Sequence, residues 1–309
     1  ITVTGGDGAI GGNDINLFGN LASTGTGGAD LIDINGDVLL GAGITITGAG
    51  VAGDTIDFST IVDGTQTLSI SGGSAAVSLN GAVGGNTALA GFTVSDAAQL
   101  DVGNVTVADG DISLTATSID LNATSYAITG AAGGDDTITV SGAVDLYANV
   151  TITGGGNAGD TITINNGVDA DAATNDRSLS FVGGSGNVDV NGALGGTRSL
   201  AGGVTISGAQ IDTVGITTDA GDTNENAGAI DIDGSGAVTV AGALSAVGSG
   251  TGDGGTVAVD ASGANAVSVV GITTTGGGGT GDAGGAITLN DAGGAGTVTI
   301  GGGLDSSAA

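Results

Sequence analysis

The sequence contains no cysteine, histidine, lysine, proline, methionine or tryptophan among its 309 residues. Without cysteine there is no disulfide framework, so stability has to come from packing or from bound ions. Without histidine, cysteine or lysine there is no imidazole or amine base and no thiol nucleophile. Paired carboxylates are the remaining route to acid–base catalysis, and we expect a protein that is not an enzyme.

Aromatic residues make up only 2% of the chain although 39% is hydrophobic, so a core would consist of Val, Ile, Leu and Ala. Glycine is abundant at 68 residues, but the absence of proline excludes the collagen repeat. Low-complexity disorder is the competing interpretation. The persistent alternation of β-branched apolar residues favours an ordered chain, because a disordered linker has no reason to keep it.

Basic residues are almost missing, since only Arg177 and Arg198 oppose 32 acidic residues and the net charge is −30. Such a chain repels nucleic acids and anionic lipids, so we expect neither as a direct partner. The acids are aspartates apart from Glu225, and aspartate suits turns and cation binding. A simpler role is solubility, because like charges on a long β surface oppose edge-to-edge aggregation.

Long apolar runs are also absent: none approaches the roughly 18 residues of a membrane-spanning helix. The sequence begins at Ile1 with neither an initiator methionine nor a signal peptide, and we expect a processed piece or a segment of a larger protein. Composition shows no linker and no change of class along the chain. We therefore expect residues 1–309 to form a single continuous architecture.

One short pattern is written nearly three times near the end of the chain, in residues 229–255, 256–285 and 286–309. Each copy holds short runs in which apolar and small polar residues alternate, the period of a strand with one buried face. Glycine-rich stretches between the runs permit sharp corners. A period of about 27 to 30 residues indicates a solenoid. Three short strands per copy predict one coil of an all-β, parallel β-helix, and each coil needs its neighbours.

A longer duplication relates residues 44–97 to residues 150–209. The phrase Ile-Thr-Ile-Thr-Gly starting at Ile44 returns as Val-Thr-Ile-Thr-Gly starting at Val150, and Asn80-Gly-Ala-Val-Gly-Gly returns as Asn191-Gly-Ala-Leu-Gly-Gly. The offset grows between the two phrases, so the insertions fall between strands, as in loops of a solenoid. Coils of roughly 28 residues predict about eleven turns.

Phrases such as Asn191-Gly-Ala-Leu-Gly-Gly-Thr and Gly285-Ala-Ile-Thr-Leu resemble the repeat regions of very large bacterial surface proteins. These are the filamentous-haemagglutinin-like and related giant adhesins, which are exported by two-partner or autotransporter routes. The resemblance covers nearly the whole chain. It implies a right-handed parallel β-helix, an extracellular position at the bacterial surface, and a role as a stalk or fibre in adhesion or biofilm.

Calcium is the cofactor that the acidic corners suggest. Asp253 and Asp282 occupy equivalent corners of successive copies, which predicts a separation of about 5 Å, and Asp222 is a candidate for the same column. A hard divalent cation would relieve the repulsion between stacked carboxylates. Gly-Asp phrases that open strands add further candidates, although a simple turn explains each one equally well. The full set of candidate ligands is Asp222, Asp253, Asp282, Asp54, Asp160 and Asp136.

These patterns leave three functional hypotheses. The first is a structural segment of a surface fibre, with copies of itself, further repeats or cell-surface glycans as partners. The second is a secreted calcium-binding module, because the chain distantly resembles the nonapeptide repeats of bacterial toxins; here the Gly-x-Asp phrases are scattered and most lack the middle glycine. The third is a polysaccharide-active β-helix enzyme, which would need a groove where clustered aspartates meet Arg177 or Arg198.

Overall fold

The computed structural model describes residues 1–4, 15–25, 27–130, 134–263, 265–291 and 296–308. They fold as an all-β parallel solenoid of about ten turns with three parallel sheets, and the described part contains no helix. The predicted fold class is confirmed, with about one turn fewer than expected. Within the same ranges no helix is long and apolar enough to cross a membrane. The chain divides into two compact units, Ile1–Val144 and Asp145–Ala309.

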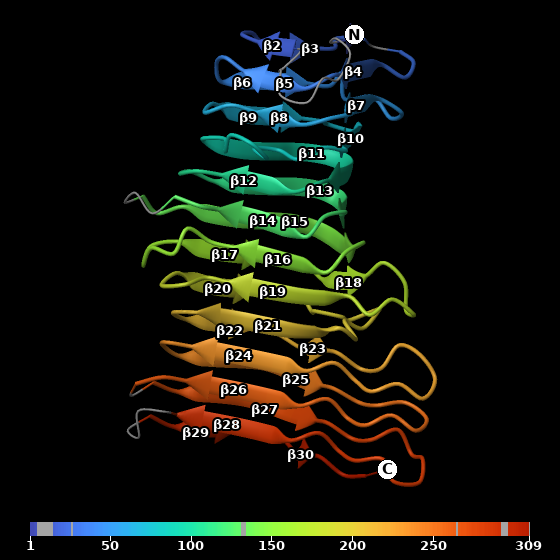
Figure 1. Ribbon diagram of the computed structural model, residues 1–309, viewed down its shortest axis with the longest axis vertical. Coiled ribbons are helices and arrows are strands. Elements are labelled where there is room, and N and C mark those ends of the chain that lie inside the picture. The colour runs from blue at the N-terminus through green and yellow to red at the C-terminus, as the bar shows by residue number, and fades with distance from the viewer. Residues whose placement is uncertain (5–14, 26, 131–133, 264, 292–295, 309) are drawn as a thin grey trace. The chain divides into compact units, whose positions relative to one another are not determined.

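The strands of the first unit are mostly three to five residues long because glycine-rich corners interrupt the apolar alternation (Figure 1). In chain order they are β1 (Thr2–Thr4), β2 (Ile15–Leu17), β3 (Leu21–Ala22), β4 (Leu31–Asn35), β5 (Val38–Leu40), β6 (Ile44–Thr47), β7 (Thr55–Phe58), β8 (Val62–Asp63), β9 (Thr67–Ser71), β10 (Ala76–Leu79), β11 (Gly91–Val102), β12 (Val105–Val107), β13 (Ile112–Leu121) and β14 (Ser125–Ile128). Strand β15 (Thr137–Leu146) runs across the boundary between the units.

The second unit continues the same kind of coil. Its strands are β16 (Val150–Thr153), β17 (Thr161–Ile164), β18 (Val168–Ala170), β19 (Ser178–Val182), β20 (Asn187–Val190), β21 (Gly203–Gly208), β22 (Ile211–Thr213), β23 (Ile216–Thr217), β24 (Ile230–Gly234), β25 (Val238–Ser245), β26 (Val257–Ala261), β27 (Val267–Thr273), β28 (Ile287–Asp291), β29 (Val298–Ile300) and β30 (Leu304–Asp305). Strand β24 pairs with β26, and β26 pairs with β28, so the three repeated segments stack directly on one another.

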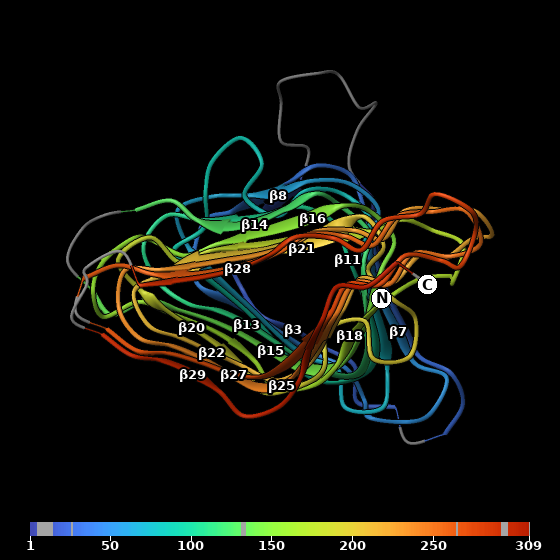
Figure 2. The same ribbon diagram turned by 90° about the horizontal axis from the view of Figure 1, so that it is seen from below.

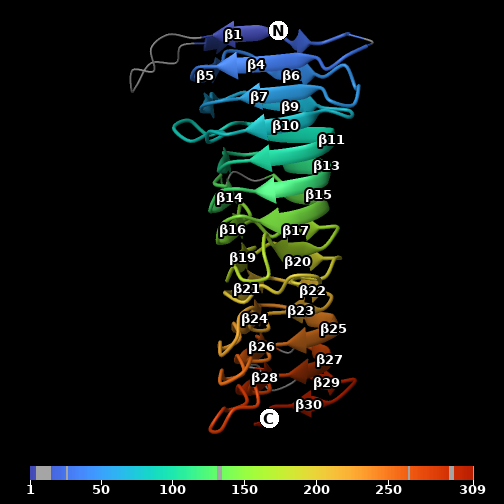
Figure 3. The same ribbon diagram turned by 90° about the vertical axis from the view of Figure 1, so that its right-hand side faces the viewer.

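The core consists of inward-facing side chains that stack in register from coil to coil. In the first unit, strands β4, β7 and β10 follow one another along the stack of coils (Figure 3). Their register places Ile32, Ile56 and Val77 in one column, and each is at most 1% exposed. In the second unit, Ile230 pairs with Val257 on the next coil. Alternate residues of the same strands face outward, which explains the period of two in the sequence.

The duplicated segments also agree in their local conformation. Gly84 in the first unit and Gly195 in the second have φ angles of +72° and +69°, a region that favours glycine. Each donates its backbone N–H to the carbonyl of a valine in the preceding coil, Val62 and Val168 respectively. The two glycines therefore form the same corner in each unit.

Candidate functional site

Three predicted calcium ligands lie buried at corners directly before a strand: Asp54, Asp136 and Asp160. The Asp54 carboxylate accepts hydrogen bonds from the backbone nitrogen of Val51 at 2.9 Å and from that of Asp30, in the preceding coil, at 2.9 Å. Asp160 accepts one from the backbone nitrogen of Asn157 at 2.7 Å. In Asp54 and Asp160 the side chain thus closes its own turn, as expected of an Asx-type turn.

Other aspartates, which the sequence did not single out, join one coil to the next. Asp63 is 2% exposed, and its Oδ1 accepts hydrogen bonds from the backbone nitrogens of Asn86 at 3.0 Å and Thr87 at 3.1 Å. Asp219 accepts one from Val247 at 2.8 Å. Further polar side chains, at corners or, for Asp169, on strand β18, accept backbone N–H groups between 20 and 29 residues ahead: Asn104, Asp111, Asn149, Asp169 and Asn224. The carboxylate and amide oxygens of these side chains therefore accept hydrogen bonds from backbone N–H groups of the next coil.

The remaining predicted ligands lie in a stack of three projecting loops of the second unit, residues 218–228, 246–255 and 274–285 (Figures 1 and 2). Two of the loops are closed at their base by a threonine. The Thr218 hydroxyl donates to the carbonyl of Gly228 at 2.8 Å, and the Thr274 hydroxyl donates to that of Gly285 at 2.7 Å. In the middle loop Ala246 takes this position, and only a backbone bond from Gly255, 3.0 Å long, closes the base.

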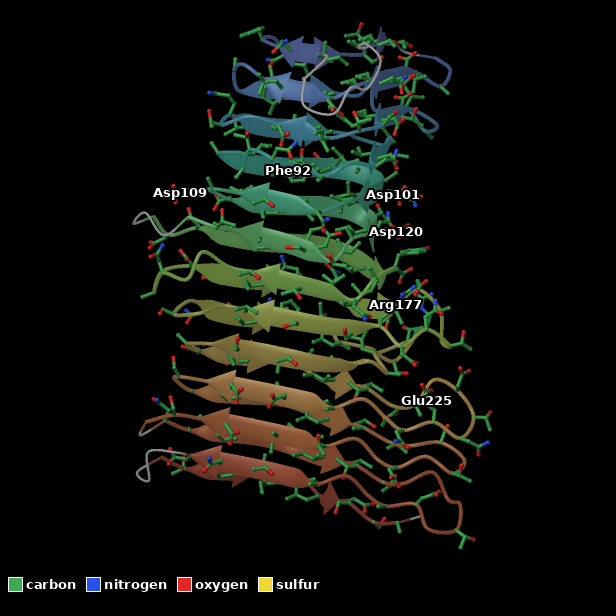
Figure 4. The ribbon with its side chains drawn as sticks, in the orientation of Figure 1. Phe92, Asp101, Asp109, Asp120, Arg177 and Glu225 are labelled. Atoms are coloured by element: carbon green, nitrogen blue, oxygen red, sulfur yellow. The ribbon has the colours of Figure 1, made fainter. Side chains whose placement is uncertain are left out.

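Backbone hydrogen bonds also join the loops of this stack to one another. The nitrogen of Ser249 donates to the carbonyl of Glu225 at 3.0 Å, and the nitrogen of Gly277 donates to that of Gly252 at 2.9 Å. Glu225 is visible at the projecting end of its loop in Figure 4. The loop stack therefore extends the coil-to-coil hydrogen bonding beyond the sheets.

The three candidate ligands of the loop stack make different contacts. Asp253 accepts a hydrogen bond from the backbone nitrogen of Ala283 at 2.7 Å, one residue beyond Asp282, whose own carboxylate accepts from the nitrogen of Gly279. The backbone carbonyl of Asp222 accepts from the Ser249 hydroxyl. The loop closed by Thr274 is two residues longer than the loop closed by Ala246, so equivalent positions in the sequence fall out of register.

In the part of the chain that the structure describes, no three acidic side chains converge as metal ligands. The carboxylates instead meet backbone donors, an arginine, or one another in pairs. Calcium binding by the predicted residues stays a prediction.

Both arginines of the sequence are held in ion pairs. Asp171 receives two hydrogen bonds from Arg177, at 2.7 and 3.0 Å, and one from the side chain of Asn175 at 2.8 Å. The Arg177 hydrogen bonds hold the pKa of Asp171 at about 2, well below its usual value. Arg198 is paired with Asp145.

An acidic contact lies beside the first of these ion pairs. Burial raises the pKa of the Asp176 carboxyl, and the neighbouring carboxyls of Glu225 and Asp222 raise it further because they repel its ionised form. Asp176 precedes strand β19, whereas Glu225 belongs to the loop stack. Two loops of the second unit thus meet through like charges.

Outward-facing aspartates form in-register pairs on neighbouring strands, a feature that the sequence reading missed. Partners in a parallel ladder lie about 4.8 Å apart. The pairs are Asp33–Asp57 and Asp101–Asp120 in the first unit, and Asp189–Asp212 and Asp233–Asp260 in the second. Figure 4 shows Asp101 and Asp120 on successive strands. In the sequence these aspartates occupy equivalent positions in the alternating runs of successive coils. They can be recognised as pairs only after the coils are aligned.

Burial and the partner carboxylate shift the titration of these pairs. Burial raises the pKa of Asp57, hydrogen bonds from Ser59 and Asn80 oppose this, and Asp33 raises it further. For Asp189, burial and then Asp212 raise the pKa. The ionised forms of Asp57 and Asp189 are therefore disfavoured in the folded chain.

A hollow of about 340 Å³ on the second unit contains one of these pairs. Asp233 and Asp260 line it together with small residues such as Ser207, Gly234 and Ser262. One carboxylate oxygen of Asp260, Oδ1, is buried and has no hydrogen-bond partner in the described part of the chain. The lining contains no arginine, so the combination of clustered aspartates with Arg177 or Arg198 that an enzyme groove requires is not formed in this hollow.

Comparisons with protein-family models, with curated proteins and with solved structures find no match to this chain. The geometry of the chain itself therefore has to carry any functional conclusion.

Proposed function

We propose that the chain is a structural segment of an extracellular bacterial surface fibre or adhesin, part of a stalk or filament in adhesion or in a biofilm matrix. The observation that carries this proposal is that aspartates on strands and at corners join one coil to the next. Asp63, Asp169 and Asp219 accept backbone N–H groups of the next coil instead of converging on a common centre. Such side chains stabilise the stacking of coils, which is what a load-bearing rod requires.

The same proposal assigns no catalytic role to the chain. Its two arginines are neutralised by Asp171 and Asp145, so neither is free to hold an anionic sugar. The sequence offers no imidazole, thiol or amine for proton transfer or nucleophilic attack. Hydrolysis of acidic and neutral polysaccharides by the purified chain should therefore stay at the buffer level, and a measurable turnover would contradict the proposal.

The partner we propose is another coil of the same kind, from further repeats or from a second copy. Strands β29 and β30 expose Val298, Ile300 and Leu304 by 42%, 41% and 45%. Their register partners in the preceding coil are fully buried: Val267, Val269 and Ile272. A stacked coil would bury these apolar side chains and pair the strand edges beside them.

Sedimentation velocity over a wide range of protein concentration tests this self-association. We expect assemblies that grow with concentration, and a variant with Val298→Asp and Ile300→Asp should remain smaller because charge is placed on the exposed edge. Monomers at every concentration would contradict the proposed partner. Binding of cell-surface glycans is the accompanying proposal for adhesion, and a glycan array tests it separately.

A calcium-binding module is the second candidate, and the unpartnered Oδ1 of Asp260 beside Asp233 favours it. Carboxylate oxygens are the ligands that calcium prefers. Calorimetric titration with calcium should then give a saturable signal that Asp260→Asn weakens. No saturable binding would remove this candidate and leave the structural proposal unaffected.

A further inference from the structure

The in-register aspartate pairs place like charges at the positions where neighbouring coils are most closely joined. Partners in a parallel ladder leave the sheet in the same direction, about 4.8 Å apart, and like charges directly opposite each other destabilise a sheet. Three of the pairs with this geometry are Asp33–Asp57 and Asp189–Asp212, whose members are half-buried, and Asp233–Asp260, in which Asp260 is half-buried and Asp233 is exposed.

In the second unit the residues in register with Asp189 and Asp233 on the neighbouring strands carry no positive charge. Asp189 lies between Thr163 of strand β17 and Asp212 of strand β22. Asp233 lies between Ser207 of strand β21 and Asp260 of strand β26. Asp231, on the same strand as Asp233, adds a further negative charge.

In the first unit, Asp57 is likewise bordered by one acidic residue and one residue with a hydroxyl group. Asp57 lies between Asp33 of strand β4 and Ser78 of strand β10. The side chains of Ser59 and Asn80 donate hydrogen bonds to Asp57 at 3.4 and 2.9 Å. Hydroxyl and amide groups therefore border Asp57, whereas the N-terminal ammonium of Ile1 lies beside the strand of Asp33, where it donates to the carbonyl of Leu31.

We propose that these aspartate pairs make the solenoid responsive to pH, so that its coils repel when both carboxylates of a pair are ionised and tighten when one of them is protonated. One proton shared by a pair replaces the repulsion between two carboxylates with a hydrogen bond across the two strands. The response is built into the coil itself, and it does not depend on assembly into a fibre.

The direction follows from the raised pKa values of Asp57, Asp189 and Asp233, each above an ordinary value of 3.8. The folded chain binds these protons more tightly than the unfolded chain, so the contribution to stability grows as pH falls from neutral through the folded pKa values. It disappears again as pH rises. The Asp171–Arg177 pair has the opposite sign, because its stabilisation is lost as pH falls towards about 2.

Urea denaturation of the whole chain at about pH 7.5 and about pH 4, close to the ordinary pKa of aspartate, tests the proposal, with a chelator present and ionic strength held constant. We expect the midpoint urea concentration of the unmodified chain to be higher at the lower pH. The double variant Asp189→Asn, Asp233→Asn should have a raised midpoint at the higher pH and should lose at least half of the pH-dependent gain.

Asp305→Asn is the matched control, because the register partner of Asp305 is Thr273 and no acid faces it across the ladder. It removes one negative charge and should keep the full pH-dependent gain. The proposal would be overturned if the midpoint urea concentration of the unmodified chain were lower at the lower pH than at the higher pH. An equal pH response in the double variant and the control would overturn it as well.

Discussion

Two buried threonines of the second unit allow one chemical change to be tested with opposite expected signs. Thr213 is 2% exposed, lies in register with Val190 and Val240, and its hydroxyl has no hydrogen-bond partner in the described part of the chain. Thr218 is fully buried, and its hydroxyl donates to the carbonyl of Gly228 at the base of the loop stack. Replacing each threonine by valine exchanges a hydroxyl for a methyl group of similar size.

The magnitudes follow from what each hydroxyl does. An unpaired buried polar group costs about 1–3 kcal/mol, so Thr213→Val should raise the free energy of unfolding by about 1–2 kcal/mol. Thr218→Val removes a satisfied hydrogen bond and leaves the carbonyl of Gly228 with one partner fewer. This change should lower the free energy of unfolding by about 1–2 kcal/mol. The difference between the two variants is larger than either effect alone.

Urea denaturation followed by circular dichroism measures the free energy of unfolding of each variant. The two variants are compared if their m values, the slopes of that free energy against urea concentration, are equal. Thr274→Val, at the equivalent loop base, should behave like Thr218→Val because its hydroxyl donates to Gly285 in the same way. Destabilisation by Thr213→Val of about the size seen for Thr218→Val would refute the reasoning. That result would mean that the Thr213 hydroxyl has a partner, such as a buried water molecule.

Three further predictions concern the corners. Asp63→Ala should lower the free energy of unfolding by about 2–3 kcal/mol, since two backbone donors lose their acceptor; Asp63→Asn, which keeps an acceptor oxygen, should restore most of it in the same denaturation assay. Gly195→Ala should cost more than about 1 kcal/mol, because φ is positive and the new methyl carbon would lie 2.2 Å from the carbonyl oxygen of Thr217; an unchanged melting temperature would contradict this. Acid titration by NMR should place the Asp171 carboxyl near pKa 2, and Arg177→Gln should return it towards 3.8.

The fold class was predictable because every strand carries its own signal. In Ile230–Gly234 and Val257–Ala261 alternate residues are apolar, and the same alternation recurs about one coil later. Inward positions need only a β-branched or other aliphatic side chain of suitable size, so pattern alone identifies them. The number of turns was less certain, because corner lengths vary between coils.

The roles of the acidic residues were less predictable, because they depend on register across coils. Asp253 accepts a hydrogen bond from the backbone nitrogen of Ala283, directly after Asp282, and this contact depends on the paths of two loops that differ in length by two residues. Asp63 carries no local signal for its backbone partners, which lie 23 and 24 residues ahead. A sequence period gives the strand positions, whereas the hydrogen bonds at the corners require the three-dimensional path of each loop.

Cryo-electron microscopy of the chain at high concentration, with calcium and with a chelator, tests the central claim most directly. A structural segment held by stacked coils and carboxylate-to-backbone hydrogen bonds should form filaments with an axial repeat of about 4.8 Å in both conditions. Filaments that collapse on chelation would contradict that claim and make calcium the element that holds the coils. Single soluble particles in both conditions would contradict the role as a fibre segment.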